Sequence, residues 1–237
     1  MKPVLVFRHA RTEGPGHFAT FLAEHGVEWK LVALDEGDPV PGSSGPYAGL
    51  GFMGGPMSAN DELPWTQPVL RLMRDAVERG VPVIGHCLGG QMLARAMGAR
   101  VARHDRKEIG WVALRAEPTA TAARWLGEAR GFAAFEWHED TFAIPERAER
   151  ILTGEYCVNQ AYVLDGRHLG MQCHVEVTAE MIETWCRIGI EDIDEAIGKS
   201  PAVQDALTIR SLALRNLAPL TAVASRLYTR WIEGLKR

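Results

Sequence analysis

The sequence predicts an α/β fold, in which helices cover both faces of a mostly parallel β-sheet to make a three-layer sandwich. Short apolar runs alternate with helical patterns through residues 1–175, and segments rich in glycine and proline separate them. The order strand, helix, strand indicates parallel strands joined by right-handed crossovers. The chain of 237 residues is long enough to bury the core of such a fold, in one domain or two.

The first half of the chain carries the clearer pattern. Residues 65–79 have apolar side chains at intervals of three and four, and Gly80 follows where a C-cap glycine is usual, so a helix is predicted there. Residues 35–47 are rich in Gly, Pro and Ser and are predicted to be a loop. We expect strands at Val4–Arg8, Trp29–Leu34, Ala48–Met53 and Val81–His86, and helices at His17–His25, Trp65–Arg79 and Leu88–Met97.

The pattern weakens from residue 101 to residue 154 and changes after residue 177. Asp165–Gly166 lies between two apolar runs and predicts a β-hairpin. Only helical patterns follow Val177, so we expect residues 190–237 to be a helical extension packed on a main domain of residues 1–189. The expected strands are Trp111–Leu114, Phe132–Trp137, Cys157–Leu164 and His168–His174, and the expected helices are Thr119–Leu126, Thr178–Arg187, Glu191–Ile197 and Val203–Leu235.

Composition excludes several classes of protein. The net charge of −4 comes from interleaved acidic and basic residues without a basic block, so no nucleic-acid partner is expected. No apolar run reaches the ~18 residues of a membrane span, and the first run, Val4–Phe7, ends at Arg8 and is too short for a signal peptide. The four cysteines form no CxxC pair, which argues against a disulfide framework. A cytoplasmic protein without membrane association is therefore expected.

The segment Gly85-His86-Cys87-Leu88-Gly89 has the spacing of a nucleophile elbow with cysteine as the nucleophile. Such a residue lies on a sharp strand-to-helix turn, where side chains two positions away on either side would collide, so glycine is needed at both. The N-terminus of the following helix favours an anionic sulfur. The Leu88 N–H is placed to donate to an oxyanion.

A buried, inert position is the usual fate of a free cysteine. The flanking glycines and the strand–helix context favour the catalytic interpretation for Cys87. The side chain of His86 is expected to point away from the nucleophile, because neighbouring side chains on a strand alternate. Cys157, Cys173 and Cys186 lack flanking glycines and are predicted to belong to the core.

His174 and Glu176 are two residues apart on a predicted strand, so their side chains share one face. A carboxylate beside an imidazole orients it and stabilises its charged form. With eight histidines in the chain, such a pair also arises by chance. The pair lies near the C-terminal end of a strand, where the functional sites of α/β folds are found. This position favours His174 as the base, and Glu176 as its orienter, for a cysteine that is far away in the sequence.

Two further segments are candidates for the site. Gly54 and Gly55 follow a short predicted strand and allow a tight turn whose N–H groups could donate to an oxyanion, although Gly-Gly-Pro also occurs in ordinary loops. His138 and Asp140 could line a pocket or stand at the surface, and a structural or pocket-edge role is favoured. No phosphate-binding loop, HExxH or CxxC occurs, so neither a cofactor nor a metal is expected.

In this order, the GGP, GHCLGGQ and HxE motifs resemble those of class I glutamine amidotransferases, over residues 1–180. The chain is most similar to the glutaminase domain of GMP synthase and its free-standing relatives. Three further segments agree with the free-standing group, namely KEIGW (Lys107–Trp111), WHED (Trp137–Asp140) and GMQCHVE (Gly170–Glu176). The resemblance implies the flavodoxin-like class I glutamine amidotransferase fold.

The resemblance also implies roles for individual residues. Cys87 would be the nucleophile, His174 the general base and Glu176 its orienter. The N–H groups of Gly55 and Leu88 would form the oxyanion hole, and Gly54 and Gln91 would help to hold the substrate. The chain departs from the family pattern at three positions, which bear on substrate fit and change no reacting group: His86, Gly90 and Val175.

The expected activity is hydrolysis of the glutamine side-chain amide through a cysteinyl thioester, giving glutamate and ammonia. Three functions compete at this point. The chain could be a glutaminase subunit that passes ammonia to a separate synthase chain, a stand-alone hydrolase of γ-glutamyl amides or peptides, or a non-catalytic regulatory module. The intact Cys, His and Glu argue against the third. In the first two cases the partner is a small molecule, glutamine or a γ-glutamyl compound.

Overall fold

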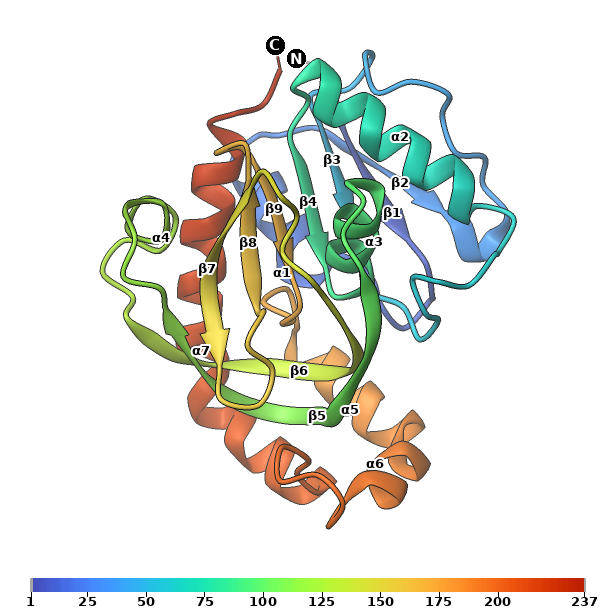
Figure 1. Cartoon of the computed structure of the whole chain (residues 1–237). Helices are drawn as coiled ribbons and strands as arrows, with labels where there is room; N and C mark the ends of the chain where they lie inside the picture. The colour runs from blue at the N-terminus through green and yellow to red at the C-terminus, as the bar shows by residue number, and fades with distance from the viewer. Residues whose placement is uncertain (1, 237) are drawn as a thin grey trace.

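The structure is a computed structural model that describes residues 2–236. Within this range, nine strands form one sheet in the order β2-β1-β3-β4-β9-β8-β7-β5-β6 (Figure 1). The strands are β1 Val4–Arg8, β2 Trp29–Ala33, β3 Gly49–Phe52, β4 Val83–His86, β5 Val101–Ala116, β6 Gly131–Phe142, β7 Ala148–Gly154, β8 Ala161–Leu164 and β9 His168–Met171. The helices are α1 Gly16–Glu24, α2 Thr66–Arg79, α3 Leu88–Ala96, α4 Ala120–Leu126, α5 Ala179–Ile188, α6 Ile190–Ala196 and α7 Ala206–Ile232.

The parallel part of the sheet comprises β2, β1, β3, β4 and β9, each paired in parallel with its neighbour. Helices α1 and α2 are crossovers between strands of this part, and α3 follows β4. The sheet begins with the doubly wound order of flavodoxin-like folds. The predicted α/β fold with a mostly parallel sheet is therefore confirmed. In such folds the functional site lies beyond the carboxyl ends of the strands.

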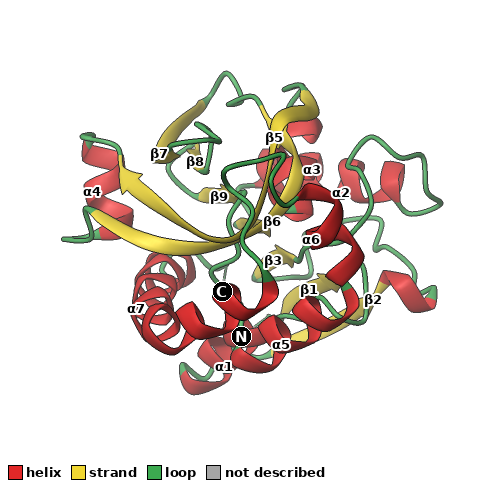
Figure 2. Ribbon diagram, turned by 90° about the horizontal axis from the view of Figure 1, so that it is seen from below, coloured by secondary structure: helices red, strands yellow, loops and turns green. Residues whose placement is uncertain are grey.

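Successive side chains of β1 point alternately into two hydrophobic cores, one on each face of the sheet. Val4 and Val6 belong to the core under α1 and α7, whereas Leu5 and Phe7 belong to the core under α2 and α3. Figure 2 shows α1, α5 and α7 on one side of the strands and α2 and α3 on the other. This arrangement makes the three layers that the sequence predicts.

The antiparallel part of the sheet departs more from the sequence prediction. The hairpin at Asp165–Gly166 is present, with positive φ angles of 52° and 67°. The predicted strand 168–174 is too long, because β9 ends at Met171. Strand β7 was not expected at all, and β5 begins at Val101 rather than Trp111. Polar residues fill 103–108, where β5 also carries an irregularity in its pairing with β6, so no regular alternation marks this stretch as a strand.

Two helix ends are capped, and the sequence predicts the cap at the first of them. Gly80 ends α2 in the left-handed conformation, with φ 62°. Thr178 begins α5, where its side chain accepts a hydrogen bond from the Met181 N–H at 3.2 Å. Among residues 2–236, no helix combines the length and the hydropathy that crossing a bilayer requires.

Helix α7 packs against α1 and contributes to the core of the main sheet. The rings of Tyr228 and Trp231 lie 4.9 and 5.5 Å from the ring of Phe18, centroid to centroid. The Tyr228 hydroxyl is also 3.0 Å from Nε2 of His86, the last residue of β4 before Cys87. The C-terminal helix thus supports the strand that leads to the candidate nucleophile. The division into domains at residue 189 stays a prediction.

Trp231→Ala is expected to lower the free energy of unfolding by about 3–5 kcal/mol, because it removes a fully buried indole from this core. Leu214→Ala on the same helix is the matched control, since Leu214 is 92% exposed and its loss should change stability by less than about 0.5 kcal/mol. Urea titration followed by circular dichroism measures both. Equal stability of the two variants would contradict a structural role for α7.

Candidate active site

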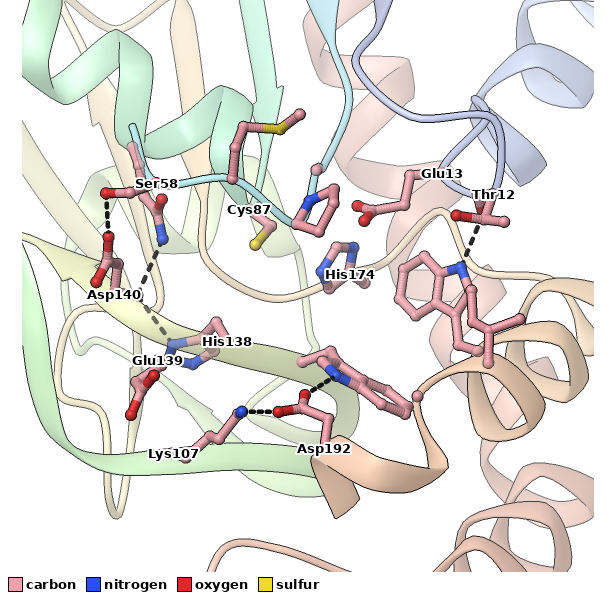
Figure 3. Close-up of a pocket in the computed structure, with 18 residues that line it drawn as sticks. Thr12, Glu13, Ser58, Cys87, Lys107, His138, Glu139, Asp140, His174 and Asp192 are labelled. Atoms are coloured by element: carbon pink, nitrogen blue, oxygen red, sulfur yellow. Dashed lines mark hydrogen bonds and ion pairs between the residues drawn. The ribbon is translucent and has the colours of Figure 1, made fainter. Parts of the chain in front are cut away.

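A cavity of about 580 Å³ opens beyond the carboxyl ends of β1, β3 and β4. Cys87 and His174 both lie in its wall, as Figure 3 shows. The cavity is therefore where the fold predicts a functional site. The remaining lining residues are Thr12, Glu13, Gly55, Pro56, Met57, Ser58, Gln91, Lys107, Trp137, His138, Glu139, Asp140, Trp185, Ile188, Gly189 and Asp192.

Cys87 occupies a strained bend between β4 and α3. Its φ and ψ angles are 46° and −107°, a conformation that non-glycine residues rarely adopt. A methyl group added at Gly85 would stand 2.5 Å from Gly89 O, and one added at Gly89 would stand 2.7 Å from the Phe52 carbonyl carbon. Both flanking positions therefore require glycine, and their close packing holds the cysteine at the bend.

His174 and Glu176 lie beyond the end of β9 rather than on it. The His174 N–H donates to Phe135 O at 2.8 Å, so the segment is fastened to β6. His174 Nδ1 is 2.7 Å from Glu176 Oε1, and both side chains are buried. The structure thus brings the predicted base and orienter together, although the regular strand invoked for them ends earlier.

The electrostatics of the pair favour a charged imidazole. Burial alone would lower the pKa of His174, but the negative charges of Glu176 and Cys87, and hydrogen bonds to both side chains, outweigh it and raise the pKa well above its usual value. Burial alone would raise the pKa of Glu176, yet the positive charge of His174 holds it below its usual value. An imidazolium beside the sulfur stabilises a thiolate.

The turn with Gly54 and Gly55 lies against the elbow. A methyl group added at Gly55 would stand 2.8 Å from Leu88 Cδ2, so the two residues that carry the candidate oxyanion donors pack against each other. Among the described residues, the N–H groups of Gly55 and Leu88 have no backbone acceptor. His9 is buried beneath the turn, with Nδ1 3.3 Å from Gly54 O, and burial lowers the pKa of His9 to about 4. A neutral His9 can therefore donate to Gly54 O and hold the turn.

The cavity wall beside α3 is polar. Gln91 is almost fully buried, and its Nε2 donates to Asp140 O at 2.9 Å and to Gln172 Oε1 at 3.3 Å. Gln172 Nε2 in turn lies 3.6 Å from Cys87 Sγ. The Asp140 carboxylate accepts from Ser58 Oγ at 2.6 Å. Gln91 and Asp140 thus line the same side of the cavity.

His138 is held by buried polar groups behind this wall. Its Nε2 is 2.7 Å from Glu108 Oε2, and its Nδ1 is 3.1 Å from Asp140 O. Glu108, His138 and Cys157 place potential metal ligands within 4.8 Å of one another, a cluster that the sequence did not suggest. His138 and Glu108 already bond to each other, and Cys157 lies 3.2 Å from Thr141 Oγ1. Each of the three side chains thus has a hydrogen-bond partner, although Glu108 Oε1 is buried without one.

The other three cysteines are buried core residues, as their sequence context predicts. Burial raises the pKa of Cys157 to about 12 and the pKa of Cys173 well above its usual value. Cys186 lies on α5, and burial raises its pKa as well. Of these three thiols, none lines the cavity.

Two residues of the cavity carried no signal in the sequence. Glu13 follows β1 in an irregular loop, and a methyl group added at Gly54 would collide with its carboxylate and stand 2.9 Å from His174 Cε1. The Trp185 ring lies edge-on to the His174 imidazole, 4.8 Å between centroids. Periodicity explains Trp185 as a core residue of α5, and only the tertiary structure places both side chains beside His174.

Comparisons with known proteins agree with this geometry. A model of the family "Glutamine amidotransferase class-I" matches residues 18–184, a range that includes Cys87, His174 and Glu176. A crystal structure of a glutamine amidotransferase from Methylobacillus flagellatus has a TM-score of 0.98 and 46% sequence identity, covering 100% of this chain and 96% of that one.

Two curated relatives extend the comparison. The glutamine amidotransferase-like protein YfeJ of Salmonella typhimurium is 26% identical over 199 residues, which cover 81% of this chain and 82% of that protein. A glutamine-hydrolysing GMP synthase of Leifsonia xyli is 34% identical over 144 residues, which cover 55% of this chain but only 26% of that protein. The chain thus spans about a quarter of the length of this GMP synthase. The family model matches more than half of the chain and spans the elbow, so the chain belongs to the class I glutamine amidotransferase family.

Proposed function

We propose that the chain is a cysteine-dependent amide hydrolase that cleaves the side-chain amide of glutamine, or a related γ-glutamyl amide, through a thioester. The observation that carries this proposal is the meeting of Cys87, on its strained bend, with the His174–Glu176 pair in the wall of one cavity. Membership of the class I family supports the same chemistry.

In the proposed mechanism the Cys87 sulfur attacks the γ-carbonyl carbon as a thiolate, while His174 holds the proton. The oxyanion accepts hydrogen bonds from the N–H groups of Gly55 and Leu88. His174 then protonates the departing amine, which is ammonia when glutamine is the substrate, as the C–N bond breaks and the thioester remains. A water molecule gives its proton to His174 and attacks the thioester, which releases glutamate and restores the thiol.

The size of the cavity favours a second candidate, a stand-alone hydrolase of larger γ-glutamyl amides. Its volume of about 580 Å³ lies within the range of sites for drug-sized ligands, about 300–1000 Å³. Glutamine is smaller than such ligands, so space remains beside His174 for a substituent on the amide nitrogen. The similarity to a glutamine-hydrolysing GMP synthase supports the other possibility, a separate synthase chain that takes up ammonia.

The experiment that tests the proposal uses the purified chain. Ammonia and glutamate are measured with glutamine as substrate, and a glutamine-like chloroketone is then used to label the active site before mass spectrometry. We expect stoichiometric release of both products and an adduct on Cys87. An adduct on another cysteine, or none on the folded protein, would contradict the assignment. Hydrolysis without any partner chain supports a stand-alone enzyme, and stimulation by an added synthase supports a glutaminase subunit.

Glu176→Gln is expected to lower kcat for glutamine by about a hundred- to ten-thousandfold, because the carboxylate that stabilises the His174 imidazolium is lost. The alkylation rate of Cys87 by iodoacetamide at neutral pH should fall in parallel, since the His174 imidazolium beside the sulfur is no longer stabilised. Glu180→Gln is the control, because this exposed residue of α5 does not line the cavity. A Glu176→Gln variant with unchanged kcat would remove Glu176 from the mechanism.

A further inference from the structure

The cavity has two sides that differ in chemistry. Figure 3 shows Ser58 and Asp140 on one side of Cys87, and Glu13 and Thr12 on the other, beyond His174. If the proposed function holds, His174 protonates the departing amine, so the leaving group must lie on the His174 side. The γ-glutamyl group then lies on the side of Ser58 and Asp140.

Glu13 gives the leaving-group side a negative charge. Its carboxylate lines the cavity on the same side of Gly54 as His174 Cε1, because a methyl group added at Gly54 would meet both. Within residues 2–236, no basic side chain makes an ion pair with it, and no hydrogen bond contributes to its pKa shift. The proposed mechanism assigns no step to Glu13. Among the described residues, His174 is the one neighbouring group whose positive charge acts on this partly buried carboxylate, so a second cation that enters the cavity is favoured.

Two tryptophan side chains also line the cavity, and one of them is fixed to the residue that precedes Glu13. The indole of Trp185 is fixed by a hydrogen bond from Nε1 to Thr12 O at 2.7 Å. Trp137 packs against Trp185 with 6.2 Å between ring centroids, and its Nε1 donates to Asp192 at 2.7 Å. Lys107 also lines the cavity, and its ammonium group is paired with Asp192. The wall therefore presents indole surface, which attracts organic cations.

We infer that this site takes γ-glutamyl amides whose leaving amine carries a second, positively charged amino group, and that Glu13 is the residue that selects for this charge. The alkyl chain of such an amine would lie along the indoles of Trp137 and Trp185, and its ammonium group would reach the Glu13 carboxylate. The Glu13 carboxylate would repel a leaving amine that ends in a carboxylate.

The selection should depend on pH. Burial raises the pKa of the Glu13 carboxyl to about 7, the positive charge of His174 opposes this shift, and the negative charge of Glu176 adds to it. Glu13 is therefore ionised above about pH 7 and neutral below it. The preference for a cationic leaving group should grow as the pH rises from about 6 to about 8, although activity itself also follows the titration of His174.

The test compares three amides of the glutamate γ-carboxyl that match in length, made with diaminobutane, pentylamine and aminopentanoic acid. They end in a cationic, a neutral and an anionic group. We expect kcat/KM to be about tenfold higher for the cationic amide than for the neutral one at pH 8, the size of one partly screened charge pair, and lowest for the anionic amide. In Glu13→Gln the cationic and neutral amides should be cleaved equally well, and in Glu13→Asp part of the preference should remain.

Glu139→Gln is the matched control, because Glu139 is another cavity-lining acid but is paired with Arg103. It should keep the preference for the cationic amide. Titration calorimetry of the three amides with the inert Cys87→Ala variant, and with Cys87→Ala/Glu13→Gln, measures the same selection without turnover. For Cys87→Ala, Kd should be lowest for the cationic amide and highest for the anionic amide. For Cys87→Ala/Glu13→Gln, Kd should no longer depend on the charge of the amide.

The outcomes separate the inference from the proposed function. Cleavage of the neutral amide at the same rate as the cationic one, or a preference that survives in Glu13→Gln, would overturn the role of Glu13 and leave the hydrolase intact. Charge-ordered binding to Cys87→Ala, together with no cleavage of any amide or of glutamine by the wild type, would support the cation subsite and refute the hydrolase. If Kd for Cys87→Ala does not depend on the charge of the amide, the cation subsite is refuted, whether or not the wild type is a hydrolase.

Discussion

Cys87→Ala is expected to lower the rate of glutamine hydrolysis by at least about a thousandfold while the protein stays folded. The sulfur is the atom that forms the thioester, and no other side chain in the cavity wall is placed on a comparable bend. Alanine retains the small volume that the bend requires, so the free energy of unfolding should change by less than about 1.5 kcal/mol. Ammonia release and thermal unfolding measure the two effects separately.

Cys186→Ala is the matched control for this experiment. Cys186 is a free, buried cysteine on α5 that lies outside the cavity. Its replacement should leave kcat within a few-fold of the wild type and lower stability modestly, as loss of a small buried group does. A Cys87→Ala rate within about tenfold of the wild type, or a dead Cys186→Ala variant that is still folded, would refute the assignment of the nucleophile.

Gly85→Ala is expected to abolish hydrolysis and to lower the free energy of unfolding by about 2–4 kcal/mol. The added methyl group would stand 2.5 Å from Gly89 O and from Gly90 N. These are backbone atoms at the start of α3, so the overlap is relieved only if the helix moves away from β4. Such a shift displaces both Cys87 and the Leu88 N–H from their positions in the cavity. Urea unfolding and ammonia release measure the two effects.

Gly42→Ala provides the comparison, because a methyl group at Gly42 meets no atom within 4 Å and its φ angle is not positive. Stability and activity should stay at wild-type levels or rise slightly, since alanine restricts the unfolded chain. A Gly85→Ala variant that matches Gly42→Ala in both measurements would mean that the elbow tolerates a side chain. The close packing at Gly85 would then have no part in placing the nucleophile.

The accuracy of the sequence prediction follows the local strength of the pattern. Helix α2 and the strands before it were predicted to within a residue or two at each end, because buried elements of a doubly wound fold show apolar periodicity. Strand β7 and the first part of β5 were missed. They belong to the antiparallel part of the sheet, where the polar residues at 103–108 break the alternation. Pairing with β6, a long-range contact, makes this stretch a strand.

The sequence by itself determined the parallel α/β core and the residues of a candidate Cys–His–Glu site, because the elbow spacing and the His–Glu spacing follow from local backbone geometry. Only the tertiary structure decided how these residues meet. His174 reaches the cavity through a bridge to β6 after β9 has ended, and Glu13 arrives beside it from the loop after β1. No periodicity encodes contacts between loops far apart in the chain, since packing of the surrounding elements sets them.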